Sequence, residues 1–363
     1  MGIFLLKNVI KKSVDAFRNS SFSPSLYIPR RHIHHDNTGH LPNKLSLLRR
    51  SHGGNNDGGD QMHYFSLLST KNFSPEKQFH LPFSKIKVVG SCNGVVCVED
   101  EEAEGRTALW NPSTNDFKSL PKTCIQRHPS ASYVDFNSSG FGFDCNSQDY
   151  RVVRFVDNVF ETKEGDYHHN EHHAELYSLK SDSWKEIPYP LGMLTLESGA
   201  YVNGVFYCVA ISKMGEEILS FDFGNHKFCS FGFPESGKRI GPYTTHLLEW
   251  DGSLAAIVYP YYGKGEKSFD LWVRNNESWV RVSIYRVSGA VRPLGFWTKD
   301  VLLFEGTSYD LRLFDLATQE SKHLHIFDYP EVLEFISYIE STVVLNGKSA
   351  REHRGILNLN EQD

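Results

Sequence analysis

Four histidines lie within a short stretch of the chain, and their spacing could support metal chemistry. His168 and His172, like His169 and His173, are four residues apart, so a helix would place each pair on one face, where two imidazoles can bind one divalent ion. The surrounding residues 157–173 (DNVFETKEGDYHHNEHH) have no helical apolar periodicity and are polar and turn-prone. The pattern therefore favours a solvated loop without a metal ion, and such a loop is a candidate for binding a partner.

Other side chains that could carry catalysis have simpler structural explanations. Asn111-Pro112-Ser113-Thr114 lies between two apolar segments, where Asn and Pro form a turn and Ser and Thr bond the local backbone. The Gly-rich stretch SHGGNNDGGDQ lacks the Lys-Ser/Thr of a phosphate-binding loop. Four aspartates that recur with the repeat described below are expected to form turn and strand-end hydrogen bonds: Asp222, Asp251, Asp270 and Asp315.

These interpretations predict a chain that is not an enzyme and has no catalytic, cofactor-binding or metal-binding residues. Trp250 and Trp297 lie beside expected hairpin turns and could reach a surface. Together with His168, His169, His172 and His173, they are the candidate partner-binding side chains.

Composition excludes several classes of partner. The 363 residues include 38 Lys and Arg against 44 Asp and Glu, a net charge of −6, whereas nucleic-acid-binding and membrane-surface-binding proteins usually carry a basic excess. Six dispersed cysteines without a CxxC pair indicate reduced thiols and a cytoplasmic or nuclear protein. Neither a signal peptide nor a stretch of about 20 apolar residues is present, so we expect no membrane association.

A repeated hairpin organises most of the chain. Six segments each contain an apolar strand with a central aromatic residue, a polar turn and a second strand, and these aromatics are Phe65, Trp110, Tyr177, Phe221, Trp272 and Phe314. Their spacing of 42 to 67 residues is typical of kelch-type propeller blades. A second β-like pair precedes five of the hairpins, with two-residue turns such as Asn93-Gly94 and Asn203-Gly204. The repeat predicts an all-β propeller of six four-stranded blades.

The ends of the chain would complete this ring. Residues 334–347 (EFISYIESTVVLNG) can pair with the N-terminal hairpin, so that the N- and C-terminal strands share one blade and no sheet edge remains at the junction. The predicted domains are a short irregular or helical arm and linker at 1–61, the propeller at 62–347 and a disordered tail at 348–363. The longest spacing, 67 residues between Trp110 and Tyr177, locates an insertion at residues 157–173.

The motifs of the propeller also resemble a known family. The run VVGSCNGVVCVEDEEAEGRTALWNPSTNDFKSLP closely resembles the opening of plant F-box-associated domains, and further segments follow in the order typical of that family. These are GFGFDCNSQDYRVVRFV, AELYSLKSDSWKEI, GAYVNGVFYCVA, ILSFDFGNHKF, FDLWVRNNESW, PLGFW and LRLFDLATQESKHL. The resemblance covers about Phe65 to Gly347, and FISYIESTVVLNG is similar to the end of the S-locus F-box branch.

This resemblance implies the protein-recognition subunit of an SCF-type ubiquitin ligase, in which the propeller binds a target protein destined for degradation. An N-terminal F-box would dock on a Skp-family adaptor and, through it, on a cullin scaffold. The sequence lacks the L-P-x-E start, R-L-P-V-K-S-L middle and C-V-S-K-S-W end of an F-box, and only Phe17 and Phe22 resemble adaptor-binding positions. The resemblance therefore implies a truncated or missing F-box.

One alternative belongs to a different class of function. A kelch-type propeller can be an enzyme or a ligand-binding protein with a metal or small-molecule site. That function would require Tyr207, Cys208 or the histidines near His168 to converge across blades.

Overall fold

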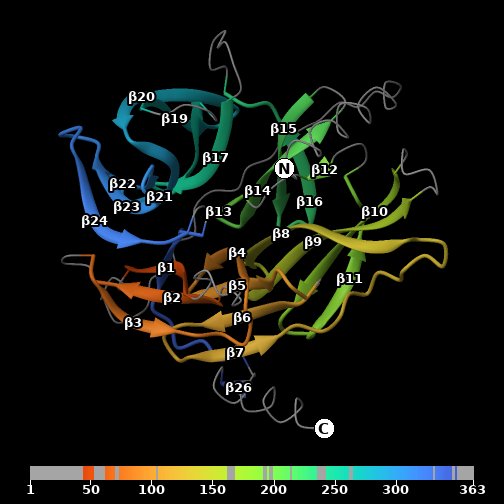
Figure 1. Ribbon diagram of the computed structural model, residues 1–363. Helices are drawn as coiled ribbons and strands as arrows, with labels where there is room; N and C mark the ends of the chain where they lie inside the picture. The colour runs from red at the N-terminus through yellow and green to blue at the C-terminus, as the bar shows by residue number, and fades with distance from the viewer. Residues whose placement is uncertain are drawn as a thin grey trace.

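The computed structural model describes residues 44–52, 62–69, 73–103, 105–161, 168–190, 194–195, 199–212, 215–234, 243–260, 265–329, 332–345 and 348–349. Within these ranges the chain forms β-strands and no helix, so no helix there is able to cross a membrane. The strands form six antiparallel sheets arranged as the blades of a propeller (Figure 1). The predicted fold class is confirmed.

Blades 1 to 3 follow the chain from its N-terminal side. Blade 1 contains, in sheet order, β25 (Glu334–Ile339), β1 (Lys44–His52), β2 (Met62–Leu68) and β3 (Pro75–Phe79). Blade 2 contains β4 (Ile86–Cys92), β5 (Val95–Asp100), β6 (Thr107–Asn111), β7 (Asp116–Ser119) and, outside β7, β26 (Lys348–Ser349). Blade 3 contains β8 (Tyr133–Asp144), β9 (Asp149–Glu161), β10 (His168–Ser178) and β11 (Ser183–Ile187).

Blades 4 to 6 complete the ring. Blade 4 contains β13 (Ala200–Val202), β14 (Val205–Ser212), β15 (Gly215–Asp222) and β16 (Lys227–Phe231), with β12 (Leu194–Thr195) also paired to β14. Blade 5 contains β17 (Tyr243–Trp250), β18 (Ser253–Pro260), β19 (Glu266–Asn275) and β20 (Ser278–Ser288). Blade 6 contains β21 (Ala290–Thr298), β22 (Val301–Gly306), β23 (Asp310–Asp315) and β24 (Ser321–Phe327).

The hydrophobic core is divided into six clusters, each between two neighbouring blades. Trp110 of blade 2, for example, packs at 5.1 Å from the rings of both Phe65 and Phe79 of blade 1. The six central aromatics found in the sequence all lie on the third strand of a blade, and none is more than 8% exposed. Large aromatic side chains at this position fill the wedge between adjacent sheets, which is why their spacing revealed the blade number.

Strands from both ends of the chain close the ring in blade 1. Leu47 of β1 lies opposite Ile336 of β25 on one side and opposite Leu67 of β2 on the other. Arg49 forms an ion pair with Glu334 of the same blade at 2.8 Å, and its guanidinium also joins the neighbouring blade by donating to the carbonyl of Ile86 at 2.7 Å. The strand β1 lies before the boundary expected at residue 62, so blade 1 begins at Lys44.

Residues 340–345, which follow β25 and which we call the C-terminal strap, lie along blade 2 and connect it to blade 1. The buried Asn111 amide donates to the carbonyls of Ser341 at 3.0 Å and Val343 at 2.8 Å, while its oxygen accepts from the Ser113 amide at 2.9 Å. The Asn111 turn predicted from the sequence is therefore confirmed, and it also holds the C-terminal strap. Lys348 and Ser349, placed in the expected disordered tail, pair with β7.

All six cysteines are free, as predicted from their spacing. Cys92, Cys97 and Cys208 are buried, and burial raises the pKa of the Cys92 and Cys208 thiols to about 12. These thiols remain protonated and unreactive at neutral pH. Cys145 is exposed, so burial protects only part of the set.

Candidate partner-binding surface

The first three strands of blade 3 are each longer than the corresponding strands of the other blades, and they form an extended ribbon. We use the name blade 3 ribbon for residues 133–138, 156–161 and 168–173, where β8, β9 and β10 continue as one sheet. Tyr133 lies opposite Val159, and Glu161 lies opposite His168. The prediction of a loop over residues 157–173 is therefore wrong, because strand pairing continues on both sides of residues 162–167. Residues 162–167 themselves lie outside the described part of the chain.

Polar side chains in the blade 3 ribbon pair with one another, which explains how a polar sequence forms a strand. Asp157 and Asn158 are each only 2% exposed. The Asp157 carboxylate lies 2.8 Å from His172 Nδ1 and accepts from Asn170 Nδ2 at 3.1 Å. The Asn158 oxygen accepts from the His128 amide at 3.1 Å, so a connector from outside the ribbon covers it. Burial of polar groups that have such hydrogen-bond partners reduces the free energy of unfolding only slightly.

His172 lies on one side of β10 and is fixed in orientation. Its ring stacks on Tyr189, with centroids 5.3 Å apart and planes 17° apart, and Tyr189 packs edgewise on Phe155. Burial is the largest factor that raises the pKa of Tyr189, which keeps its phenol neutral. The Asp157 carboxylate occupies His172 Nδ1, so a ligand would meet this half-buried imidazole through Nε2.

His173 lies on the opposite side of the strand, because successive side chains alternate. Its Nδ1 lies 2.9 Å from Glu186 Oε1 of the neighbouring strand β11, and its Nε2 lies 3.8 Å from Glu171 Oε2. His168 and His169 are in β10 opposite Glu161 and Phe160, but the structure does not describe their side chains.

The helical arrangement that would let these histidines share a metal ion is absent, because residues 168–178 form a strand. Among the described residues there is no group of three or more His, Cys, Asp or Glu side chains with the geometry of a metal site. Tyr207 and Cys208 are adjacent on β14 and therefore point to opposite faces of blade 4. Among the side chains that the structure describes, these groups do not converge as a metal site would require.

The two candidate tryptophans lie far from the blade 3 ribbon, in blades 5 and 6. Trp250 Nε1 donates to the carbonyl of Lys299 at 2.9 Å, so its ring bridges the first turns of these two blades. Trp297 packs between Phe73 of blade 1, at 4.4 Å, and Phe335 at 6.1 Å. Both rings are half-buried and brace neighbouring blades. Phe17 and Phe22 lie outside the described residues.

A buried ion pair supports the base of the blade 3 ribbon, and no sequence motif identified it. Arg154 of β9 and Glu175 of β10 have fully buried side chains and bond at 2.6 and 2.9 Å. Arg154 Nη1 also donates to the carbonyl of Gly105 at 2.7 Å, and the Glu175 carboxylate accepts from the Thr123 hydroxyl and the Cys124 amide. The pair thus fastens blade 2 and the connector before β8 to the ribbon.

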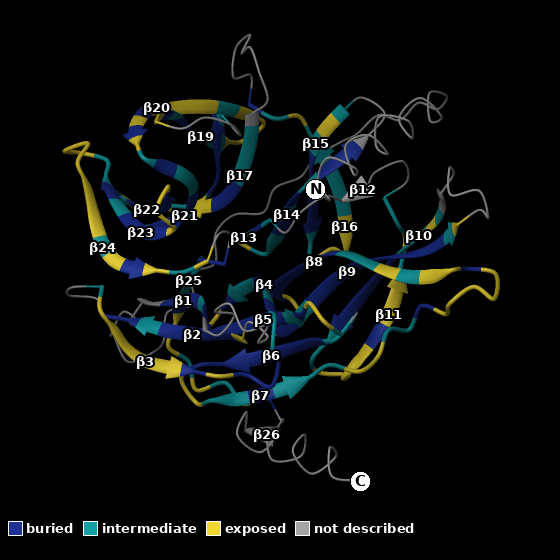
Figure 2. Cartoon of the chain, in the orientation of Figure 1, coloured by how far each residue is buried: buried dark blue, intermediate teal, exposed yellow. Residues whose placement is uncertain are grey.

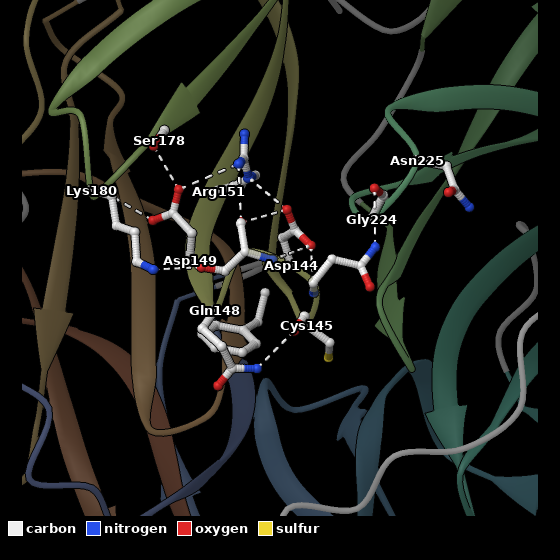
Figure 3. A network of polar contacts seen from close by, with 12 residues as sticks. Asp144, Cys145, Gln148, Asp149, Arg151, Ser178, Lys180, Gly224 and Asn225 are labelled. Carbon is white, nitrogen blue, oxygen red and sulfur yellow. Dashed lines mark hydrogen bonds and ion pairs between the residues drawn. The ribbon is translucent and has the colours of Figure 1, made fainter.

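The other end of blade 3 consists of tight turns, shown in Figure 3. Asp144 accepts from the backbone of Asn146 and the hydroxyl of Ser147, and its carboxylate lies 3.3 Å from Arg151 Nε. Asp149 accepts from the Ser178 hydroxyl at 2.6 Å. These carboxylates order turns, a structural role comparable with that of Asp222 and Asp315, whose oxygens accept from backbone amides two and three residues ahead as predicted.

Asp270 differs from the other three repeated aspartates. It lies within strand β19, fully buried, where it accepts from the Ser268 hydroxyl at 3.3 Å and lies 4.0 Å from Arg281 Nη1. The expectation of a turn is therefore wrong for Asp270, because the apolar alternation around it continues as strand on both sides.

Replacing Asp144 with asparagine should make stability less dependent on acidity. Burial raises the pKa of Asp144, but hydrogen bonds from Ser147 and Asn146 and the charge of Arg151 outweigh it, so the folded pKa lies below its ordinary value. We expect Asp144→Asn to lower the free energy of unfolding at pH 7 by about 1–3 kcal/mol. The wild-type advantage is complete above the unfolded pKa of about 3.9 and disappears as the pH falls through the lower folded value.

Urea denaturation across pH 2 to 7 measures this difference. The exposed turn residue Asp300 provides a matched control for the replacement of aspartate by asparagine. An Asp144→Asn difference that stayed constant down to pH 2 would contradict the assignment.

Comparison with known proteins identifies relatives of this chain. The model of a family described as F-box associated beta propeller domain matches residues 52–309. F-box protein At3g07870 of Arabidopsis thaliana is 26% identical over 65% of this chain and 62% of its own length. F-box/kelch-repeat protein At3g23880 is 27% identical over 60% and 57%, and F-box protein CPR1 is 23% identical over 67% and 64%, both from Arabidopsis thaliana.

The chain spans about six tenths of the length of these curated relatives. Solved structures similar to it include the tricorn protease, with a TM-score of 0.41 and 8% identity over 81% of this chain and 30% of that one. A likeness this remote does not indicate a shared activity.

Proposed function

Because the chain belongs to the family of F-box associated beta propeller domains, we propose that it recognises a target protein for an SCF-type ubiquitin ligase. In this role the propeller binds the target, and associated subunits transfer ubiquitin. The relatives with printed names are F-box proteins, which supports the proposal at the level of the family. The cytoplasm or nucleus would be the site of this activity.

The blade 3 ribbon is the surface that we assign to the target. It extends the sheet of one blade, and it presents half-buried imidazoles whose orientation is fixed by carboxylates, as at His172 and His173. Its base is held by the buried Arg154–Glu175 pair, which orders that part of the surface before a partner arrives. A preorganised surface loses less conformational entropy on binding. This ribbon is the observation that carries the assignment.

Shortening the ribbon tests the assignment of the target surface. Phe155 lies opposite Ala174, so a two-residue Asn-Gly turn can replace residues 156–173, including His172 and His173, and leave the lower register of blade 3 intact. We expect the melting temperature to change by only a few degrees and the proteins that co-purify with the wild-type chain to be lost. Full retention of those proteins by a folded variant would place the target surface elsewhere.

Adaptor docking is tested separately. The native chain and a version with a complete F-box grafted before Phe17 are compared for capture of a Skp-family adaptor. Capture by the native chain would support a complete receptor that also engages the cullin scaffold. If only the grafted version binds, the native propeller holds its target without delivering it to the ligase.

A further inference from the structure

The outer strand of blade 5 differs from the outer strands of the other blades. β20 (Ser278–Ser288) contains 11 residues, whereas the other outer strands contain between 4 and 7. Short outer strands, Pro75 at the start of β3 and the mixed charges of Lys185 and Glu186 on β11 are common protection against unwanted strand pairing. β20 is longer, contains no proline, and carries charge of one sign only, from Arg281 and Arg286.

β20 also exposes aliphatic side chains along its length. Val280, Val282 and Ile284 are 48%, 45% and 46% exposed. Figure 2 shows β20 at the outer margin of the propeller with much of its length exposed. Branched aliphatic residues favour extended structure and pack well against a neighbouring strand. The strand therefore combines a long edge with side chains suited to sheet contacts.

One edge of β20 has no neighbouring strand within the described part of the chain. Of the strands that the structure describes, only β19 pairs with it. Blade 2 shows that this propeller can accept an additional strand, because β26 pairs with its outer strand β7 (Figure 1). A row of backbone N–H and C=O groups on such an edge binds an extended peptide by completing the ladder.

The charge of β20 indicates which kind of peptide it would bind. Arg281 and Arg286 are its only ionisable side chains other than Tyr285, and both arginines are exposed, with Arg281 lying 4.0 Å from Asp270. A second copy would place arginine-bearing strands side by side, and residues 1–43 carry six Lys or Arg against two Asp. Both of these occupants are disfavoured by like charge. A partner segment rich in Asp or Glu is favoured instead.

From these observations we propose that β20 binds an extended segment of a partner protein in which acidic residues alternate with apolar ones. The segment adds a fifth strand to blade 5, with its acidic side chains facing Arg281 and Arg286. This surface lies in a different blade from the ribbon assigned to the target, so it does not depend on the proposed function.

A synthetic peptide that alternates glutamate with valine is the probe, and the full-length chain is the receptor. Hydrogen exchange should show slower exchange of the β20 amides at residues 278–288 when the peptide is bound, and little change in the blade 3 ribbon. A peptide with lysine in place of glutamate should bind at least about fivefold more weakly. No binding of the glutamate peptide, or protection of a different blade, would overturn the proposal.

Charge reversal at Arg286 provides the second measurement. Arg286 lies on the exposed outer strand, and Arg286→Glu should lower the affinity for the glutamate peptide about fivefold while raising the affinity for the lysine peptide. The matched control is Lys322→Glu on β24, the exposed outer strand of blade 6, and it should change neither affinity. Equal effects of the two variants would overturn the proposal. Light scattering of the free chain is the last check: a dimer whose stability changes in Arg286→Glu would show that β20 pairs with a second copy, and it would also overturn the proposal.

Discussion

Replacing Arg154 with methionine should lower the free energy of unfolding by about 3–5 kcal/mol, because it leaves the Glu175 carboxylate buried without its partner. Both side chains are 0% exposed, and without Arg154 the carboxylate would keep neutral donors, among them the Thr123 hydroxyl and the Cys124 amide. Removal of Arg154 also frees the carbonyl of Gly105, which weakens the contact between blades 2 and 3. Chemical denaturation measured by circular dichroism gives the change.

Two variants separate the buried charge from the loss of packing. Arg154→Met combined with Glu175→Gln should recover part of the loss, because a neutral amide still accepts from Thr123 and Cys124. Lys85→Met removes a surface pair with Glu102, whose side chains are 40% and 43% exposed, and should cost less than about 1 kcal/mol. If Arg154→Met and Lys85→Met lower the free energy of unfolding equally, the buried pair does not stabilise blade 3 as we propose.

A chain that ends at Leu333 should lose its single cooperative unfolding transition. It lacks β25, so β1 loses one of its two paired neighbours and becomes a free edge inside the ring. Ile336 and Tyr338, at 5% and 3% exposure, are removed from the core between blades 1 and 2. The free edge and the exposed apolar surface both favour aggregation. Differential scanning calorimetry and light scattering measure the two effects.

The matched control ends at Ser349 and keeps β25, the C-terminal strap and β26. Its transition should remain cooperative, with a midpoint close to that of the full chain. A cooperative transition of the shorter chain at the same midpoint would show that blade 1 closes without β25.

The features predicted correctly from the sequence are those that the architecture repeats. Phe65, Trp110 and Tyr177 occupy equivalent positions in successive blades, so their spacing revealed the blade number without any knowledge of contacts. The pairing of residues near 334 with the N-terminal hairpin followed from the need to remove an open sheet edge.

The features that the sequence did not reveal depend on contacts made at one place only. Asp157, Asn158 and His172 have the composition of a loop, yet they form a strand because each finds a hydrogen-bond partner on a neighbouring segment. The Arg154–Glu175 pair joins residues 21 positions apart and belongs to no motif. β1 has an apolar pattern too short to distinguish a propeller strand from the end of a preceding domain.

Closure by β1 and β25 has a consequence for synthesis. The four main strands of each of the other five blades are close in sequence and can form as the chain leaves the ribosome, whereas blade 1 must wait for residues 334–339. Contacts of such long sequence separation form slowly. The N-terminal strand therefore remains without one neighbour for nearly the whole of translation, and a chain whose translation stops early never hides that edge. Residues 334–339 thus distinguish a chain whose ring has closed from one whose translation stopped before them and left that edge exposed.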